Sequence, residues 1–131
     1  MSNNSYYFCQ DSKVALQIFD DFKRDGYPSS VAGYGIESIR YLGEPGYDSL
    51  VADRKPTLAT SKSSPMLTLR FKNGCVVQLR ASGTEPKFKY YIEMRGEPGV
   101  SRDEVEKELM QMSRLVLEEI CQPKKNGLVV P

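Results

Sequence analysis

The chain has 131 residues, of which 40% are hydrophobic and 27% are charged, which fits one globular domain and excludes a largely disordered chain. Its 18 Lys and Arg residues nearly balance 17 Asp and Glu residues, so we expect no nucleic-acid partner, which would need a basic excess. No apolar run approaches the roughly 20 residues that span a bilayer, and the first residues do not resemble a signal peptide, so we expect no membrane partner.

The first predicted element is a helix over residues 13–25, preceded by a candidate short strand at residues 6–9. Asp11 and Ser12 can cap the helix, its apolar residues recur at helical spacing, and Gly26 ends it. A strand is predicted next, over residues 36–42. The polar stretch 43–65 then predicts a long loop that is either mobile or shaped by a partner surface.

Alternating apolar residues on either side of Asn73 and Gly74 predict a β-hairpin. A two-residue loop would mix the apolar and polar faces of its two strands, whereas a three-residue loop over 72–74 keeps them matched. We therefore expect Gly74 in the left-handed conformation. The expected pairs are Leu67 with Leu79, Leu69 with Val77, and Phe71 with Cys75.

A further strand over residues 88–94 precedes a helix that Ser101 and Glu104 open as a capping box. An apolar stripe runs along that helix, which ends near Pro123, and residues 123–131 predict a flexible tail. The element order predicts an α+β fold in a single domain over residues 1–122. Its antiparallel sheet of about four strands would be covered on one face by two helices.

Acid–base and metal chemistry have few candidate residues in this chain. It contains no His, which removes the commonest general base and zinc ligand, and its three Cys are widely spaced. The cysteines fit reduced thiols in the cytoplasm better than disulfides. We therefore assign no catalytic residue, no metal ligand and no cofactor, and expect mainly binding.

The segment from Arg80 to Lys87 carries chemistry suited to a phosphate monoester. Arg80 offers a planar fork for two charge-assisted hydrogen bonds, and Lys87 a compact positive charge. Ser82 and Thr84 add hydroxyl donors, and Gly83 lets the backbone turn so that consecutive N–H groups converge on an anion. On composition alone, an ordinary surface turn would explain the same residues.

This segment resembles R-x-S-G-T-E-P-K, the phosphate-binding loop of the α-D-phosphohexomutase superfamily. The resemblance covers most of the chain and is weakest before Gly35. It points to the branch that contains phosphopentomutase, phosphoglucomutase-2 and glucose-1,6-bisphosphate synthase, and it disfavours the mannose and glucosamine branches. The other segments that carry it are 46–48, 61–64, 73–75, 89–91, 122–123 and 125–128.

The resemblance implies that this chain is the C-terminal, fourth domain of a phosphosugar mutase. Its loop would bind the non-reacting phosphate of the sugar through Arg80, Ser82, Gly83, Thr84 and Lys87, with Lys89 a weaker candidate. Glu85 and Pro86 would shape the loop. The other three domains would be its partners: a phosphoserine in the first domain, magnesium held by aspartates in the second, and a sugar-reading loop in the third.

None of the motifs of those three domains occurs in this chain. We therefore expect the isolated chain to be inactive as a mutase. The alternative is a stand-alone module that binds a phosphorylated ligand or a protein. Because the sugar-reading motif is absent, the sequence does not choose between pentose phosphate, hexose phosphate and bisphosphate synthesis.

Overall fold

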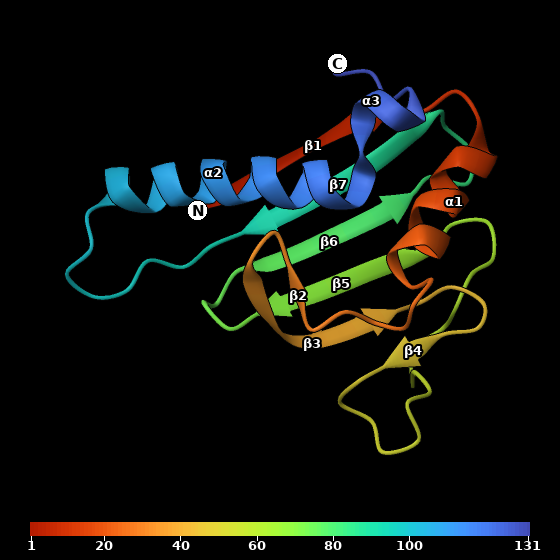
Figure 1. Cartoon of the computed structure of the whole chain (residues 1–131), viewed down its shortest axis with the longest axis horizontal. Helices are drawn as coiled ribbons and strands as arrows, with labels where there is room; N and C mark the ends of the chain where they lie inside the picture. The colour runs from red at the N-terminus through yellow and green to blue at the C-terminus, as the bar shows by residue number, and fades with distance from the viewer.

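Backbone pairing in the computed structural model, which describes residues 1–131, joins seven strands in one antiparallel sheet (Figure 1). The order across the sheet is β1-β7-β6-β5-β3-β2, and β4 pairs with another part of β3. The strands are β1 (Ser2–Phe8), β2 (Ser30–Val31), β3 (Tyr34–Tyr41), β4 (Tyr47–Asp48), β5 (Met66–Phe71), β6 (Val76–Ala81) and β7 (Lys87–Glu93).

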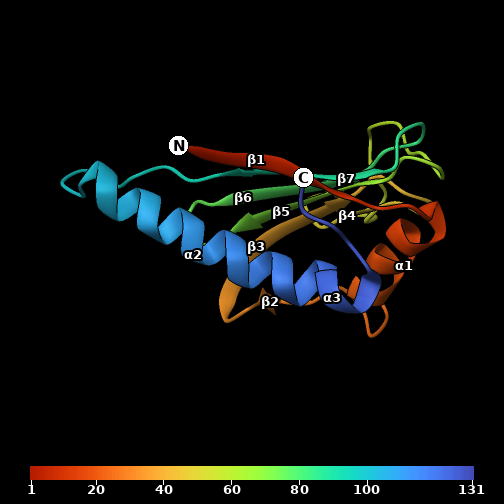
Figure 2. The same ribbon diagram turned by 90° about the horizontal axis from the view of Figure 1, so that it is seen from above.

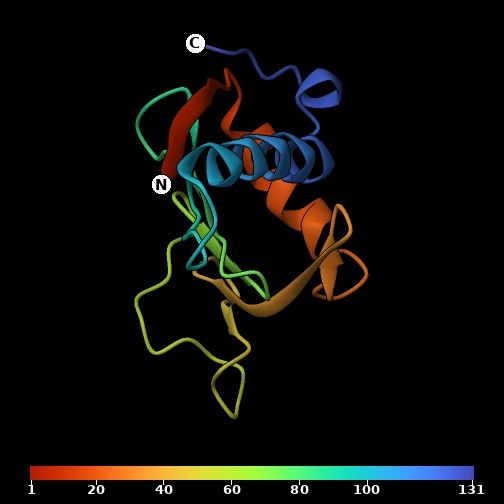
Figure 3. The same cartoon turned by 90° about the vertical axis from the view of Figure 1, so that its left-hand side faces the viewer.

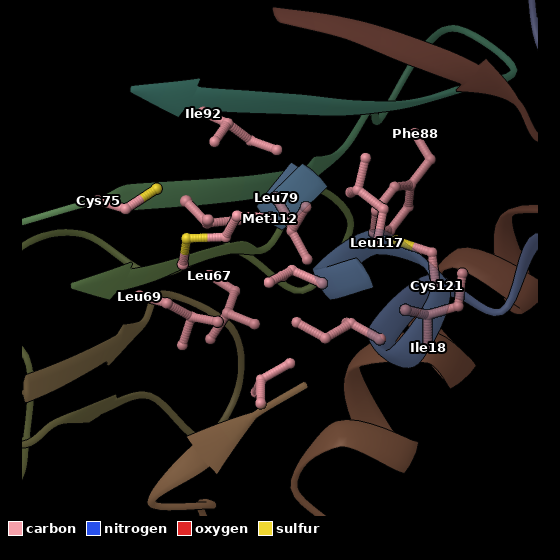
Figure 4. Close-up of a cluster of buried hydrophobic side chains, with 14 of the residues drawn as sticks. Ile18, Leu67, Leu69, Cys75, Leu79, Phe88, Ile92, Met112, Leu117 and Cys121 are labelled. Carbon is pink, nitrogen blue, oxygen red and sulfur yellow. The ribbon is translucent and has the colours of Figure 1, made fainter. Parts of the chain in front are cut away.

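Three helices complete the fold: α1 (Ser12–Phe22), α2 (Arg102–Cys121) and the short α3 (Pro123–Asn126). Figure 2 shows α1 and α2 on the same face of the sheet, while no helix covers the opposite face. The core lies between these layers, where Met112 and Leu117 of α2 face the strands (Figure 4). None of the helices combines the length and the apolar character needed to cross a membrane.

The prediction of about four strands is wrong, although the α+β class and the antiparallel sheet are confirmed. The strand β1 is longer than the predicted 6–9 because it forms a full ladder with β7, from Ser2 opposite Glu93 to Phe8 opposite Lys87. Its first residues are polar and lie at an edge, so they show no hydrophobic alternation. The two-residue strands β2 and β4 are too short to show any period.

The predicted hairpin register is confirmed. Leu67 pairs with Leu79 and Leu69 with Val77, and the Phe71 N–H donates to the Cys75 carbonyl at 2.9 Å. Gly74 has a φ of 89°, the left-handed conformation expected for the bulge position. The predicted capping box also has its first hydrogen bond, because Ser101 Oγ accepts from the Glu104 N–H at 3.2 Å.

The stretch 43–65 projects away from the helices (Figure 3) and is joined to the rest of the domain at several points. The Ser61 N–H donates to the Leu42 carbonyl at 3.0 Å, which closes the base of the loop. The rings of Tyr27 and Tyr47 stack with centroids 3.8 Å apart. These contacts give the loop a defined path back to β5.

Residues 123–131, the predicted tail, make defined contacts with the domain. They contain α3, and the side chain of Leu128 is buried in the core cluster. Phe8 and Val129 exchange two backbone hydrogen bonds, of 2.7 and 3.1 Å, so this segment pairs briefly with β1. The domain prediction over residues 1–122 did not include these contacts.

Candidate functional site

The candidate site lies where β6 ends and β7 begins. The two strands are antiparallel neighbours, and the pairing places Arg80 directly opposite Lys89. Ala81 and Phe88 are buried in the core. Because side chains alternate along a strand, Arg80, Lys87 and Lys89 lie on the sheet face that no helix covers.

Hydrogen bonds hold the connecting residues 82–86 in a closed loop. The Ser82 N–H donates to the Lys87 carbonyl at 3.2 Å, and the Glu85 N–H donates to Ser82 Oγ at 3.1 Å. The Cys9 N–H donates to the Pro86 carbonyl at 2.8 Å, which joins the loop to the segment between β1 and α1. The N–H groups of Gly83 and Thr84 have no hydrogen-bond partner within the protein and are free to bind an anion.

Gly83 contributes space to the site. Its φ is outside the left-handed region, so the turn does not depend on the conformational freedom of glycine. A Cβ atom at this position would lie 3.6 Å from Ser64 Cβ and 3.7 Å from Ser63 Oγ. A side chain here would therefore fill the gap between residues 82–86 and the end of the long loop.

An open hollow of about 410 Å³ lies at this position, and all the residues that line it are polar or glycine. It brings together five of the six sequence-predicted residues, together with Glu85 and two serines. The lining residues are Ser63, Ser64, Arg80, Ser82, Gly83, Thr84, Glu85 and Lys89. The sixth, Lys87, lines an adjacent hollow, and its Nζ lies 4.5 Å from the centroid of the Tyr6 ring.

Ser63 and Ser64 were not among the predicted site residues, although residues 61–64 carried part of the family resemblance. Ser64 Oγ donates to the Ala81 carbonyl at 2.8 Å and lies 3.5 Å from Arg80 Nε, which donates to it. Ser61 Oγ accepts from the Ser64 N–H at 3.0 Å. This serine turn therefore supports both the end of β6 and the side chain of Arg80.

The charges of the site are unevenly paired. The Glu85 carboxylate lies 3.1 Å from Lys87 Nζ and 3.6 Å from Lys89 Nζ. The hydrogen bond with Lys87, followed by the charges of both lysines, lowers the pKa of Glu85 below its usual range, and the same contact raises the pKa of Lys87. Arg80 makes no ion pair, so its guanidinium remains available to an anion.

No group of three or more acidic or cysteine side chains lies close enough together to hold a metal ion. The hydrogen-bond donors and positive charges of the hollow suit an oxyanion such as phosphate.

Comparison with known proteins gives the same family as the motif. The chain is 40% identical over 134 residues to a glucose 1,6-bisphosphate synthase of Mus musculus, and 40% identical over 129 residues to a phosphopentomutase of Homo sapiens. These matches cover 98% and 95% of the chain. The chain belongs to the phosphopentomutase and glucose-1,6-bisphosphate synthase family of phosphohexomutases.

The chain spans only 21% of the length of either relative, so it corresponds to one domain of them. A probable phosphoribomutase of Schizosaccharomyces pombe shows the same relation, with 35% identity over 99% of the chain and 22% of its own length. No family model and no solved structure matches this chain.

Proposed function

We propose that this chain is the C-terminal domain of a phosphosugar mutase and that its loop 80–89 binds the non-reacting phosphate of the substrate. One observation carries the proposal: the Arg80 guanidinium, which makes no ion pair, and the free N–H groups of Gly83 and Thr84 lie around one all-polar hollow. The names of the relatives describe enzymes that act on pentose phosphates or make glucose 1,6-bisphosphate. The substrate class is therefore a sugar carrying one or two phosphate groups.

In this role the domain orients the substrate and leaves bond breaking to other parts of the enzyme. The planar guanidinium of Arg80 donates two hydrogen bonds to the phosphate oxygens, and the backbone N–H groups of Gly83 and Thr84 add neutral donors. The hydroxyl of Ser82 accepts from the Glu85 N–H, so its own proton is free to be donated to the anion. Because β6 and β7 fix both ends of the loop, a bound phosphate is held in one position.

Fixing the idle phosphate matters because phosphoryl transfer depends mainly on positioning and electrostatics. A mutase that moves a phosphate between two hydroxyls of one sugar must present each hydroxyl in turn to the reacting centre. Binding of the phosphate that is not reacting fixes the distance and direction of the reacting hydroxyl relative to the reacting centre. The domain thereby influences the rate although it contributes no reacting atom.

The proposal is tested in the full-length enzyme that contains this chain. Arg80→Ala should lower kcat/KM for ribose 1-phosphate and glucose 1-phosphate by about 10- to 100-fold, the scale of one or two charge-assisted hydrogen bonds. Lys124→Ala, an exposed charge in α3, is the control and should leave kcat/KM unchanged. Unaltered kinetics of the Arg80 variant, or mutase turnover by the purified isolated chain, would contradict the proposal.

A further inference from the structure

Glu85 lies in the middle of the candidate phosphate loop and carries the wrong charge for a phosphate ligand. Its carboxylate pairs with Lys87 Nζ at 3.1 Å and with Lys89 Nζ at 3.6 Å, so a single acidic group occupies both lysines of the loop. The same residue lines the hollow beside Arg80. Any phosphate that enters therefore meets a negative charge already bound to part of its own site.

The backbone and the side chain of Glu85 are held to different degrees. The backbone is fixed, because its N–H donates to Ser82 Oγ and its carbonyl accepts from the Lys87 N–H at 2.8 Å. The side chain is 46% exposed, and its only ion pairs are those with the two lysines. It can therefore rotate away from the lysines while the loop keeps its shape.

We propose that Glu85 is an intramolecular competitor of the substrate phosphate, a proposal that rests on the proposed function. Arg80 and the free amides of Gly83 and Thr84 capture the anion first, because Arg80 makes no ion pair and the two amides make no hydrogen bond within the protein. The doubly charged anion then replaces the Glu85 carboxylate at Lys87 and Lys89. Exchange of one anion for another keeps phosphate binding reversible.

If Glu85 had a structural role, removing its carboxylate would change the anion affinity in the opposite direction. If the ion pairs served only to hold the lysines in position for phosphate, removal of the carboxylate would weaken anion binding. If they were ordinary solvated surface pairs, removal would have no effect beyond a general change in net charge. The direction of the change in affinity therefore separates the three cases.

The experiment is a sulfate titration of the chain, followed by amide and side-chain carboxyl NMR shifts at low ionic strength. Glu85→Gln should tighten sulfate binding by about two- to fivefold, the scale of one exposed charge pair. Glu85→Ala, which removes the carboxylate without leaving an amide, should tighten it as well. In the unsubstituted chain, the carboxyl carbon of Glu85 should shift as sulfate binds, because it loses its two lysine partners.

The matched control is Glu93→Gln, which makes the same change of charge. Glu93 lies on the face of β7 that carries Lys87 and Lys89. Glu93 is exposed and makes no ion pair. Glu93→Gln should therefore change the sulfate affinity less than Glu85→Gln does. Unchanged or weaker binding by both Glu85 variants would overturn the competitor role and leave the phosphate site intact. If sulfate moves no amide of loop 80–89 in the unsubstituted chain, the proposed function fails together with it.

Discussion

Ser64 Oγ donates a hydrogen bond of 2.8 Å to the Ala81 carbonyl, which joins the end of the long loop 43–65 to the end of β6. The same oxygen lies 3.5 Å from Arg80 Nε. A residue far from the phosphate loop in sequence therefore fixes the strand end from which Arg80 extends. Residues 61–64 are part of the site through this contact.

Ser64→Ala should lower the free energy of unfolding by about 1 kcal/mol, the scale of one hydrogen bond, and should weaken phosphate binding because Arg80 loses its support. Ser29→Ala is the control, since the Ser29 hydroxyl is exposed, makes no hydrogen bond within the protein and does not line the hollow. Urea unfolding and a phosphate titration measure the two effects. Equal stability and equal affinity in both variants would show that the contact is without consequence.

Gly83→Ala should leave the fold intact and weaken phosphate binding. The added methyl group would make ordinary van der Waals contacts, 3.6 Å from Ser64 Cβ, and the φ of Gly83 does not require glycine. It would nevertheless occupy part of the hollow next to the free N–H groups. A thermal melt should therefore be unchanged while the phosphate dissociation constant rises. A variant that unfolds, or binds phosphate as well as before, would contradict this account of Gly83.

The sequence predicted the parts of the fold that depend on local periodicity. The period of two in residues 67–79 determined the hairpin register, and the apolar stripe of α2 determined its buried face. The long ladder between β1 and β7 was not predicted, because the polar residues Ser2–Ser5 pair through their backbone atoms. Backbone pairing of an edge strand requires no hydrophobic pattern, and no pattern is present.

The candidate site was predicted to a similar degree. The motif placed Arg80 and the residues of loop 82–86 in one short segment, where proximity follows from the chain itself. The approach of Ser63 and Ser64, and the pairing of one carboxylate with two lysines, depend on how the long loop returns to β5 and on side-chain orientation. The first relation is tertiary and the second is a matter of side-chain conformation, and spacing along the chain determines neither.

Leu128→Ala should destabilise the domain by about 2–3 kcal/mol, because it removes buried side-chain atoms from the core. The result would show that residues 123–131 contribute to the fold. Val130→Ala is the control, because Val130 is 71% exposed and should lose almost no stability. Equilibrium unfolding in urea measures both. Equal stability of the two variants would support the flexible tail that the sequence predicted.

The three cysteines should be unreactive in the native protein. All are free and buried, and burial raises the pKa of Cys75 to about 11, raises that of Cys121 to about 12, and raises that of Cys9. The reactive thiolate is therefore scarce at pH 8. A thiol-reactive chromogenic disulfide should label none of them before guanidinium is added and all three afterwards. Rapid labelling of the folded chain would contradict the packing of these residues.

The most direct test of the account is a phosphate titration of the isolated chain followed by amide NMR shifts. Saturable shifts are expected at Ser82, Gly83 and Thr84 with a dissociation constant on the order of millimolar, since only one domain supplies contacts. Added salt should weaken the binding, because the charges are exposed. Arg80→Ala should abolish it with the fold intact, and Lys124→Ala should not alter it. Stationary amides at the loop, with shifts elsewhere or none, would contradict the assignment of residues 80–89 as a phosphate site.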